Sequence, residues 1–457
     1  MHGEELSVTV DAKEPAGAPA PLAKPARAYA LGVLLVIYIF NFLDRQIVNI
    51  LAEPIKLELG LADWQIGVMT GLAFAVFYTV LGIPIARYAE RADRVKIISV
   101  AVAVWSAFTI LCGMAGNFVQ LLAARIGVGV GEAGCTPPAH SLISDYTPKE
   151  KRASALALYS MGIPLGSLAG MVLGGLIADA YGWRMAFFVA GAPGILLALI
   201  AWFTLPEPRR KGLKKITPAP AASRPNILNA MAEMKDKTSF WWISVGAALS
   251  AMIGYGHIAF YGSFYLRNHG EGLLALATQL NDATGLGFGP IGFIGTALGL
   301  LFGICGAAGT YVGGILADRS ARVNPAGYAI VPAIATALTV PPFVAAMLVG
   351  DAGLSLLVLA VPIFFGAVWY GPVFASAQSL VEPHTRATAA AVLLFIINLV
   401  GLGLGPLSVG LVSDALAVTM GAAEGLRWSM VIFGLVALLS AGAFFMAART
   451  LKDEIVS

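Results

Sequence analysis

Four charged residues interrupt long apolar stretches of this sequence, and their spacing could support proton chemistry. Asp44 and Arg45 are adjacent in one stretch, and Arg125 and Glu132 lie seven residues apart in a later one. In a helix, Asn41 shares a face with Asp44 and Arg45, and a separation of seven puts Arg125 and Glu132 on one face as well. A charge at the centre of a bilayer costs about 2.5–3.5 kcal/mol, so each of the four needs a partner or a function.

Two acids and two bases in this setting indicate a proton switch. A buried carboxylate holds a proton more tightly when it is removed from water and less tightly beside an arginine. Protonation of Asp44 or Glu132 would release Arg45 or Arg125 to bind a phosphate or carboxylate of a substrate, which suits the geometry and permanent charge of arginine. We favour Glu132 as the proton carrier because neighbouring glycines leave it accessible, whereas Asp44, beside Arg45, is expected to stay ionised. The alternative is that the four residues form ion pairs that only fix helix packing.

The composition identifies lipid as the solvent of the folded chain. Hydrophobic residues make up 58% of the 457 residues and charged residues 12%, against roughly 25% charged residues in soluble proteins. A globule of this size cannot bury so much apolar surface, so we expect a polytopic membrane protein. The net charge of +3 is too balanced for a nucleic-acid partner. The three cysteines match no metal or disulfide pattern, and no metal or cofactor is expected.

Twelve apolar stretches are long enough to cross a bilayer as helices, which takes about 20 residues each. They lack the alternation of polar and apolar residues that is typical of membrane barrels. The predicted spans are residues 28–51, 65–88, 95–116, 118–143, 153–178, 184–205, 239–266, 289–317, 327–349, 354–381, 386–413 and 427–449.

The basic residues predict the orientation of these spans and the division of the chain. Most of the 29 Lys and Arg residues lie at one set of span ends, which the positive-inside rule assigns to the cytoplasm together with both termini. If the chain is bacterial, the membrane is the inner membrane. We expect a disordered cytoplasmic tail (1–27), an N-terminal six-helix bundle (28–205), a basic cytoplasmic linker with an interfacial helix (206–238), a C-terminal six-helix bundle (239–450) and a cytoplasmic tail (451–457).

The two halves of the chain repeat each other. Residues 86–94, after the second span, and residues 314–322, after the eighth, both follow the pattern small-x-apolar-Ala-acid-Arg-x-x-Arg. Similar segments also end the fourth and tenth spans and begin the sixth and twelfth. Three correspondences in the same order predict two pseudo-symmetric six-helix bundles with a site between them.

These repeated loops resemble the motif G-x-L-A-D-R-x-x-R of the major facilitator superfamily. Residues 314–322 match it fully, whereas residues 86–94 depart from it at Ala86, Tyr88 and Glu90, which would weaken the first copy as a gate lock. The resemblance implies the major facilitator fold, an all-α membrane protein with twelve transmembrane helices in two bundles. It also implies that loop acids pair with basic residues to hold one gate shut. The candidate gate residues are Glu90, Arg91, Arg94, Asp318, Arg319 and Arg322.

Two further stretches resemble the Spinster branch of this superfamily, whose members are associated with moving lysophospholipids and sphingolipids. They are residues 41–45 (NFLDR) and residues 125–134 (RIGVGVGEAG). In this superfamily the first and fourth helices line the cavity of the N-terminal bundle, which implies that the four charges share one cleft. A first helix with Asn-x-x-Asp-Arg also occurs in transporters of small organic anions.

Aromatic residues of the seventh and tenth spans are candidates for an apolar wall along an acyl chain, although packing or lipid-facing roles are at least as compatible with the sequence. The candidates are Trp369, Tyr370, Phe260 and Phe264.

The sequence therefore predicts a proton-coupled secondary transporter of an amphiphilic lipid, such as a lysophospholipid or sphingolipid-like molecule. We expect a monomer that works by rocker-switch alternating access, with protons, the lipid substrate and the bilayer as its partners. The alternative is a proton-coupled symporter of a small organic anion such as a sugar acid, which a polar C-terminal cavity would favour. The duplicated gate motifs disfavour a channel or scaffold, and no nucleophile–base pair or metal set indicates an enzyme.

Overall fold

The structure, a computed structural model, describes residues 22–208, 227–382 and 385–456. All regular secondary structure in these residues is helical, and twelve segments are long and apolar enough to cross a membrane. The prediction of an all-α protein with twelve spans is confirmed. Most of the predicted tail 1–27 and linker 206–238 lies outside the described residues, and the predicted division of the chain stays a prediction.

The first six spans run from α1 to α10, and two of them are broken by short turns. The helices are α1 (Lys24–Ile50), α2 (Ala52–Leu59), α3 (Asp63–Gly67), α4 (Ala73–Ala89), α5 (Arg94–Met114), α6 (Phe118–Glu132), α7 (Thr136–Tyr146), α8 (Arg152–Ser160), α9 (Gly162–Tyr181) and α10 (Trp183–Thr204). A π-helical turn, Val68–Leu72, joins α3 to α4 into one continuous span.

The last six spans run from α12 to α20 and follow the short helix α11 (Ile227–Lys235). The helices are α12 (Thr238–Thr284), α13 (Pro290–Leu301), α14 (Ala307–Val323), α15 (Gly327–Leu348), α16 (Ala352–Gly366), α17 (Tyr370–Ser379), α18 (Arg386–Ile396), α19 (Gly405–Met420) and α20 (Ala422–Glu454). A π-helical segment, Ile397–Leu404, joins α18 to α19.

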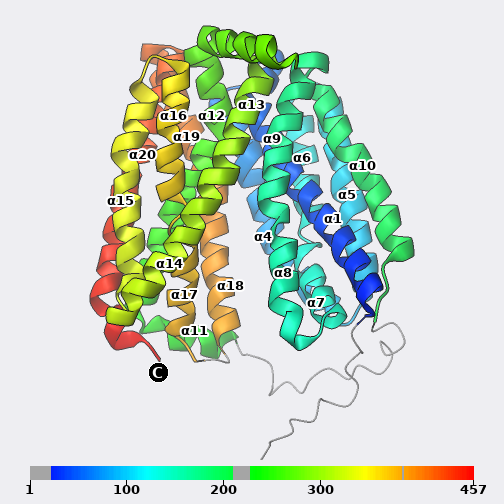
Figure 1. Ribbon diagram of the computed structural model, residues 1–457, viewed down its shortest axis with the longest axis vertical. Helices are drawn as coiled ribbons and strands as arrows, with labels where there is room; N and C mark the ends of the chain where they lie inside the picture. The colour runs from blue at the N-terminus through cyan, green and yellow to red at the C-terminus, as the bar shows by residue number, and fades with distance from the viewer. Residues whose placement is uncertain (1–21, 209–226, 383–384, 457) are drawn as a thin grey trace, which may run out of the picture.

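The spans form two bundles, with α1 to α10 on one side of Figure 1 and α12 to α20 on the other. Small residues bring helices close together inside each bundle. On α9, a Cβ atom at Gly166 would lie 2.3 Å from the carbonyl oxygen of Ile39, and one at Gly170 would lie 2.5 Å from that of Leu43. Only glycine permits this contact between α1 and α9, which packs two helix backbones directly against each other.

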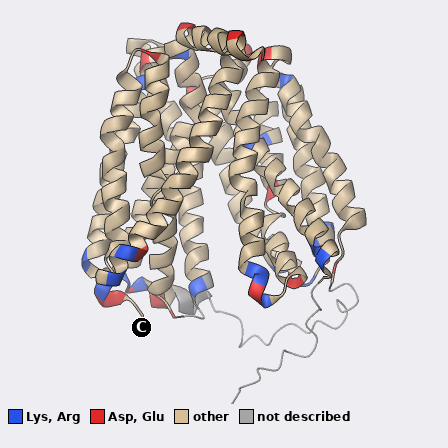
Figure 2. Cartoon of the chain, in the orientation of Figure 1, with Lys and Arg blue, Asp and Glu red and all other residues tan. Residues whose placement is uncertain are grey.

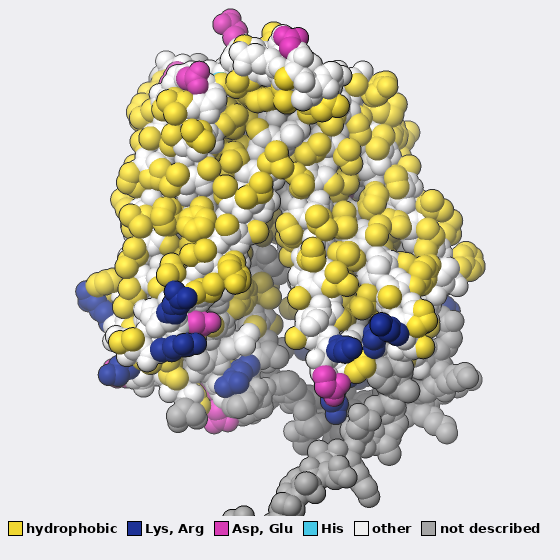
Figure 3. Space-filling view, in the orientation of Figure 1, with side chains coloured by type: hydrophobic (Ala, Val, Ile, Leu, Met, Phe, Trp, Pro, Cys, Tyr) yellow, Lys and Arg dark blue, Asp and Glu magenta, His cyan; other side chains and the backbone are white. Residues whose placement is uncertain are grey.

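The surface has a charged zone at each end and an apolar belt between them. Figure 2 shows Lys, Arg, Asp and Glu gathered at the two ends of the helices. In Figure 3, hydrophobic side chains cover the face between these zones, and residues such as Leu199 and Leu438 are 52% exposed. Such a belt is stable in contact with lipid tails, whereas its contact with water would cost a large hydrophobic free energy.

The two ends of the molecule can be told apart by the chain termini. We call the end at which α1 begins and α20 ends the termini end, and the opposite one the distal end (Figure 1). In Figure 3 the two bundles diverge at the termini end, and a groove separates them there.

Helix α12 is longer than the seventh span predicted at residues 239–266. It kinks at His269, where φ is −134° and ψ is 20°, and its last turns then lie across the distal end (Figure 1). Leu273 and Ala277, which belong to this part of the helix, are buried. The helix ends at Gly285, whose φ of 73° closes its C-terminus. The polar residues after the kink interrupt the apolar stretch, so hydrophobicity alone does not reveal this extension.

The bundles are joined at the distal end by two reciprocal helix caps. Asp414 on α19 accepts hydrogen bonds from the backbone N–H groups of Asp63 (2.9 Å) and Trp64 (2.8 Å), which begin the second span. Asp179 on α9 accepts hydrogen bonds from those of Gly292 (2.6 Å) and Ile291 (3.3 Å), near the start of α13. Each bundle thus places a carboxylate of its fifth helix at the positive N-terminus of the second helix of the other bundle.

A cluster of charges reinforces this closure. Arg267 of α12 pairs with Glu53 (2.6 Å) and Asp63 (2.7 Å) of the other bundle, and Asp63 also binds Lys56 (2.6 Å). Asp63 is only 1% exposed, and the hydroxyl of Ser413 on α19 donates a further hydrogen bond to it (2.6 Å). Glu53 and Asp63 therefore neutralise Arg267 across the interface, so the distal end is closed by both caps and ion pairs.

Substitution of Asp414 by alanine should open the distal end. Loss of a carboxylate cap costs about 1 kcal/mol, which is roughly a fivefold shift in a two-state equilibrium. Spin labels at Leu57 on α2 and Val418 on α19, which are 73% and 86% exposed, would report this shift as a larger population of long distances.

The matched control is Asp351→Ala. Asp351 caps α16 within its own bundle through the N–H of Leu354 (2.7 Å), so its loss should lower stability without lengthening the distance between the labels. Equal distance distributions for Asp414→Ala and the wild type would contradict the assignment of the closure to this cap.

Candidate functional site

The structure brings the four predicted charges together between α1 and α6. The Nε atom of Arg45 donates to the Oε2 atom of Glu132 at 2.6 Å. Arg125 faces Asp44 with 3.7 Å between Nη1 and Oδ2. Each arginine therefore pairs with an acid on the other helix, and Asp44 faces Arg125 rather than its chain neighbour Arg45.

All four side chains are almost removed from solvent. The side chain of Glu132 is fully buried, those of Arg125 and Asp44 are 1% and 4% exposed, and that of Arg45 is 19% exposed. Burial makes each charge depend on its partner, because an unpaired charge in a low-dielectric interior is far more costly than one in water. Arg45 is the most exposed member of the cluster.

Three aromatic rings surround Arg45. The guanidinium carbon lies 5.0 Å from the ring centre of Phe42, 4.7 Å from that of Phe74 and 4.6 Å from that of Tyr78. A guanidinium is weakly hydrated and binds the faces of aromatic rings, so this cage stabilises a cation without fixing it to a second carboxylate. Glu132 accepts a hydrogen bond only from Nε, so the forked end of Arg45 makes no hydrogen bond to that carboxylate.

The second pair is held loosely. The distance of 3.7 Å between Arg125 and Asp44 is too long for a hydrogen bond. Among the described residues, neither carboxylate oxygen of Asp44 nor the Nε and Nη1 atoms of Arg125 has a hydrogen-bond partner, and both amide atoms of Asn41 are also without one. Buried polar atoms left in this way each cost about 1–3 kcal/mol, so the arrangement favours binding of further polar groups.

Glycines explain how α6 carries its two charges into the bundle. A Cβ atom at Gly131 would lie 2.6 Å from the backbone nitrogen of Trp105, and one at Gly127 would lie 2.3 Å from the ring of Phe108. Both contacts are with α5. The helix then ends at Glu132, directly before the turn that leads to α7. The glycines thus serve close packing, and the carboxylate of Glu132 is fully buried rather than accessible as the sequence led us to expect.

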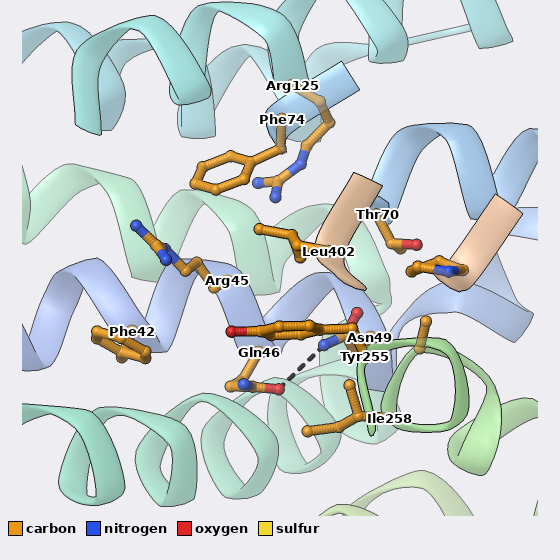
Figure 4. Close-up of a pocket in the computed structure, with 12 residues that line it drawn as sticks. Phe42, Arg45, Gln46, Asn49, Thr70, Phe74, Arg125, Tyr255, Ile258 and Leu402 are labelled. Carbon is orange, nitrogen blue, oxygen red and sulfur yellow. Dashed lines mark hydrogen bonds between the residues drawn. The ribbon is translucent and has the colours of Figure 1, made fainter. Parts of the chain in front are cut away.

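A pocket between the two bundles adjoins this cluster (Figure 4). It encloses about 480 Å³ of empty space, including its open mouth. The lining residues are Phe42, Arg45, Gln46, Asn49, Thr70, Phe74, Arg125, Tyr255, Ile258, Ala259, Leu402 and Pro406.

The two walls of the pocket differ in chemistry. The N-terminal bundle contributes every charged side chain of the lining, namely both arginines, together with the amides of Gln46 and Asn49, the hydroxyl of Thr70 and the rings of Phe42 and Phe74. The C-terminal bundle contributes mostly apolar side chains, with Tyr255 as the exception. Figure 4 shows Arg125 and Ile258 at opposite sides of the space, with Tyr255 between them. A molecule with one charged end and one apolar end fits this division.

The four aromatic residues predicted to form a substrate wall are placed elsewhere. Phe260 and Phe264 are fully buried in the core, and Trp369 is 2% exposed. Tyr370 is 40% exposed and stacks on Trp369 with 4.0 Å between ring centres. None of the four lines the pocket of Figure 4, so their role as a substrate wall remains a prediction.

Sequence reasoning passed over Tyr255, which does line the pocket. Its position between Gly254 and Gly256, within the glycine-interrupted seventh span, is the signal that could have identified it. Gly256 lets α12 approach the start of α19 beside this ring.

The predicted gate residues lie at the termini end, where the bundles diverge. Arg94 binds Asp145 (2.7 Å) and Ser141 (2.8 Å) of its own bundle and Glu207 (2.5 Å), which follows directly after α10. Asp318 accepts a hydrogen bond from Tyr328 (2.9 Å), also within one bundle.

The other predicted gate residues are exposed: Glu90, Arg91, Arg319 and Arg322. Within residues 22–208, 227–382 and 385–456, no hydrogen bond or ion pair of a predicted gate residue joins the two bundles, in keeping with the open groove between them. Their role in holding a gate shut stays a prediction. The same described residues contain no group of three or more His, Cys, Asp or Glu placed to hold a metal ion.

Known proteins are similar to this chain in both sequence and fold. A family model of the Major Facilitator Superfamily matches residues 34–406. An MFS-type efflux pump of Mycolicibacterium smegmatis is 32% identical over 433 residues, which cover 94% of this chain and 95% of that protein. The hexuronate transporter of Bacillus subtilis is 25% identical over 411 residues, which cover 86% and 90%.

A solved structure matches over nearly the whole chain. It is the crystal structure of a bacterial homologue of the human lysosomal transporter Spinster in an inward-facing, unoccupied conformation. The TM-score is 0.83 and the identity 33%, with 95% of this chain and all of that chain covered.

Removal of one charge from the Arg45–Glu132 pair should lower the stability of the protein more than removal of both charges. Arg45→Met leaves Glu132 buried without its cation, which should lower the free energy of unfolding by about 3 kcal/mol. The double variant Arg45→Met/Glu132→Met leaves no unpaired charge and should lie within about 1 kcal/mol of the wild type. Denaturation in detergent micelles measures both values.

Lys452→Met, at an exposed position, serves as the control for removal of a surface charge. An equal or larger loss of stability in the double variant would show that the pair is held by something other than mutual charge compensation.

Proposed function

The chain belongs to the Major Facilitator Superfamily and resembles its Spinster members, and we propose that it is a proton-coupled secondary transporter of an amphiphilic lipid with an anionic head. The resemblance predicted from residues 41–45 and 125–134 is confirmed at the level of the family and this branch. The substrate class and the coupling to protons are the proposal.

The two-sided pocket is the observation that carries the proposed substrate. Arg45 and Arg125 offer positive charge on the wall of the N-terminal bundle, while Ile258, Leu402 and Pro406 offer an apolar wall on the other. An anionic head placed at Arg45 would meet the forked donors that Glu132 leaves unengaged. An acyl chain would then lie along the apolar wall toward the groove at the termini end (Figure 3).

Competition for Arg45 supplies the proposed coupling. Glu132 and the anionic head are alternative partners of the same guanidinium, and a carboxylate that loses its cation in a buried site takes up a proton readily. Substrate binding would therefore draw a proton onto Glu132, and deprotonation would return Arg45 to Glu132 and expel the head. Asp44 and Arg125 form a second, looser pair beside the first and would respond to the same change of charge.

The driving force is large enough for this exchange. One charge moved across 100 mV gains about 2.3 kcal/mol, and one pH unit adds about 1.4 kcal/mol. Together they support a several-hundred-fold substrate gradient for each proton.

The arrangement in the membrane is also proposed. We place both termini and the basic termini end in the cytoplasm, according to the positive-inside rule, and we propose that a monomer is the transporting unit. The structure then corresponds to an inward-open state, closed at the distal end by the two caps and the Arg267 cluster.

Transport of a small organic anion is a second candidate. It is favoured by the similarity to the hexuronate transporter and by the two arginines in the pocket. Such a substrate would use the charged wall but would leave the apolar wall of the C-terminal bundle without a partner.

Proteoliposomes containing the purified protein distinguish the two substrates. We expect saturable transport of a lysophospholipid and no transport of glucuronate above empty liposomes, because only the lipid covers both walls. Competition between the two substrates provides the internal comparison. Saturable uptake of glucuronate without any effect of lysophospholipid would establish the organic-anion function instead.

Coupling is tested by imposing a pH gradient in either direction on the same vesicles. Wild-type transport should change several-fold with the gradient, whereas Glu132→Gln, which cannot bind and release a proton, should lose this dependence. Asp44→Asn should keep it, and its loss there would make Asp44 the proton carrier instead. Glu271→Gln, at an exposed position on α12, is the matched control and should behave as the wild type. Wild-type coupling in both site variants, with folding retained, contradicts the proton switch.

A further inference from the structure

Tyr255 is the only residue of the C-terminal bundle that brings a polar side chain to the described pocket. The other four residues on that wall are Ile258, Ala259, Leu402 and Pro406, whose side chains carry no hydrogen-bonding group. We infer that Tyr255 binds the anionic head of the substrate from the C-terminal bundle, opposite Arg45, and selects anionic lipids over neutral ones. This inference rests on the proposed transport function and adds a specificity-determining residue to it.

The position of the tyrosine supports a direct contact with the head. Figure 4 shows its ring in the middle of the pocket, with the hydroxyl toward the side on which Arg45 lies. Within the described part of the chain, the hydroxyl has no hydrogen-bond partner of its own. A phenol O–H is a good donor to a phosphate or carboxylate oxygen.

The backbone that carries Tyr255 is held firmly. At the adjacent Gly256, a Cβ atom would lie 3.1 Å from the carbonyl oxygen of Gly405 and 3.0 Å from a methyl group of Val409. This close packing joins α12 to the start of α19. On the other side of the pocket, Gln46 and Asn49 are joined by a hydrogen bond of 3.0 Å. The phenol is therefore presented on rigid elements, which is what a selective contact requires.

A contact from each bundle has a consequence for the transport cycle. A ligand shifts a conformational equilibrium only if it binds the two states differently. Arg45 lies on α1 and Tyr255 on α12, so the distance between their donors changes whenever the bundles rock against each other. A head group held by both residues binds one arrangement more tightly than the other, whereas a head held by Arg45 alone would be carried without biasing the motion.

The experiment compares two ligands that differ only in the head. Lysophosphatidate carries a phosphate, and a monoacylglycerol with the same acyl chain carries none. Binding of each to the detergent-solubilised protein is measured for the wild type and Tyr255→Phe, which retains the ring and removes the hydroxyl. We expect lysophosphatidate to bind about 10- to 100-fold more weakly to the variant, as for a lost hydrogen bond to a charged group, and monoacylglycerol to change by less than about twofold.

The matched control is Tyr311→Phe on α14, where the tyrosine is 72% exposed, and both ligands should bind it as they bind the wild type. Equal weakening of both ligands by Tyr255→Phe would mean that the ring only packs against the chain, and no weakening would mean that the hydroxyl does not contact the head. Either result overturns the inference.

Failure of the proposed lipid function gives a different result. In that case the wild type binds neither lipid but binds glucuronate, and the same variant is then tested with glucuronate. A 10- to 100-fold loss there, of the size expected for a hydrogen bond to a carboxylate, supports the role of Tyr255 for an anionic head on another substrate. Unchanged glucuronate binding overturns it.

Discussion

The pairing of two arginines with two acids inside the N-terminal bundle is the constraint on which the site depends. A single buried charge at this depth would destabilise the bundle, so each of Asp44, Arg45, Arg125 and Glu132 requires the others. The two pairs are unequal: Arg45 and Glu132 share a hydrogen bond of 2.6 Å, whereas Arg125 and Asp44 stand 3.7 Å apart. Because the pairing is unequal, N–H donors of the two arginines remain at the pocket without a hydrogen bond to a carboxylate of the described residues. Both bundles line this pocket, so a ligand bound to these donors also contacts the other bundle.

Closure at one end and divergence at the other follow from local electrostatics. Asp179 and Asp414 each cap a helix of the opposite bundle, and Arg267 is neutralised by acids across the same interface. The two caps lie in corresponding helices of the two halves, as expected of a duplicated six-helix unit. The cap contacts use short carboxylates and backbone groups rather than large apolar surfaces. They can therefore form and break as the bundles rock, because exchange with water compensates most of their energy.

Sequence patterns predicted the number of spans and the four central charges, because both depend on local rules. A span needs about 20 apolar residues, and a charge within it is conspicuous. The predicted fold of the Major Facilitator Superfamily is also confirmed. The cross-helix partners could not be predicted, since the sequence does not show that Asp44 turns to Arg125 rather than to its neighbour Arg45. The extension of α12 beyond His269 and the placement of Tyr255 in the pocket depend on how α12 packs against the other helices, which periodicity does not encode.

Infrared difference spectroscopy tests most directly whether substrate and proton exchange at the central pair. Addition of lysophospholipid to the purified protein should produce a carbonyl stretch that shifts to lower frequency in D2O, as that of a newly protonated carboxylic acid does and that of the lipid ester does not. That band should be absent from Glu132→Gln, because the substrate displaces Glu132 from Arg45 and the freed carboxylate binds a proton. If saturating lysophospholipid produces no such band in the wild type, or the same band in Glu132→Gln, Glu132 is not the group at which substrate binding and protonation meet.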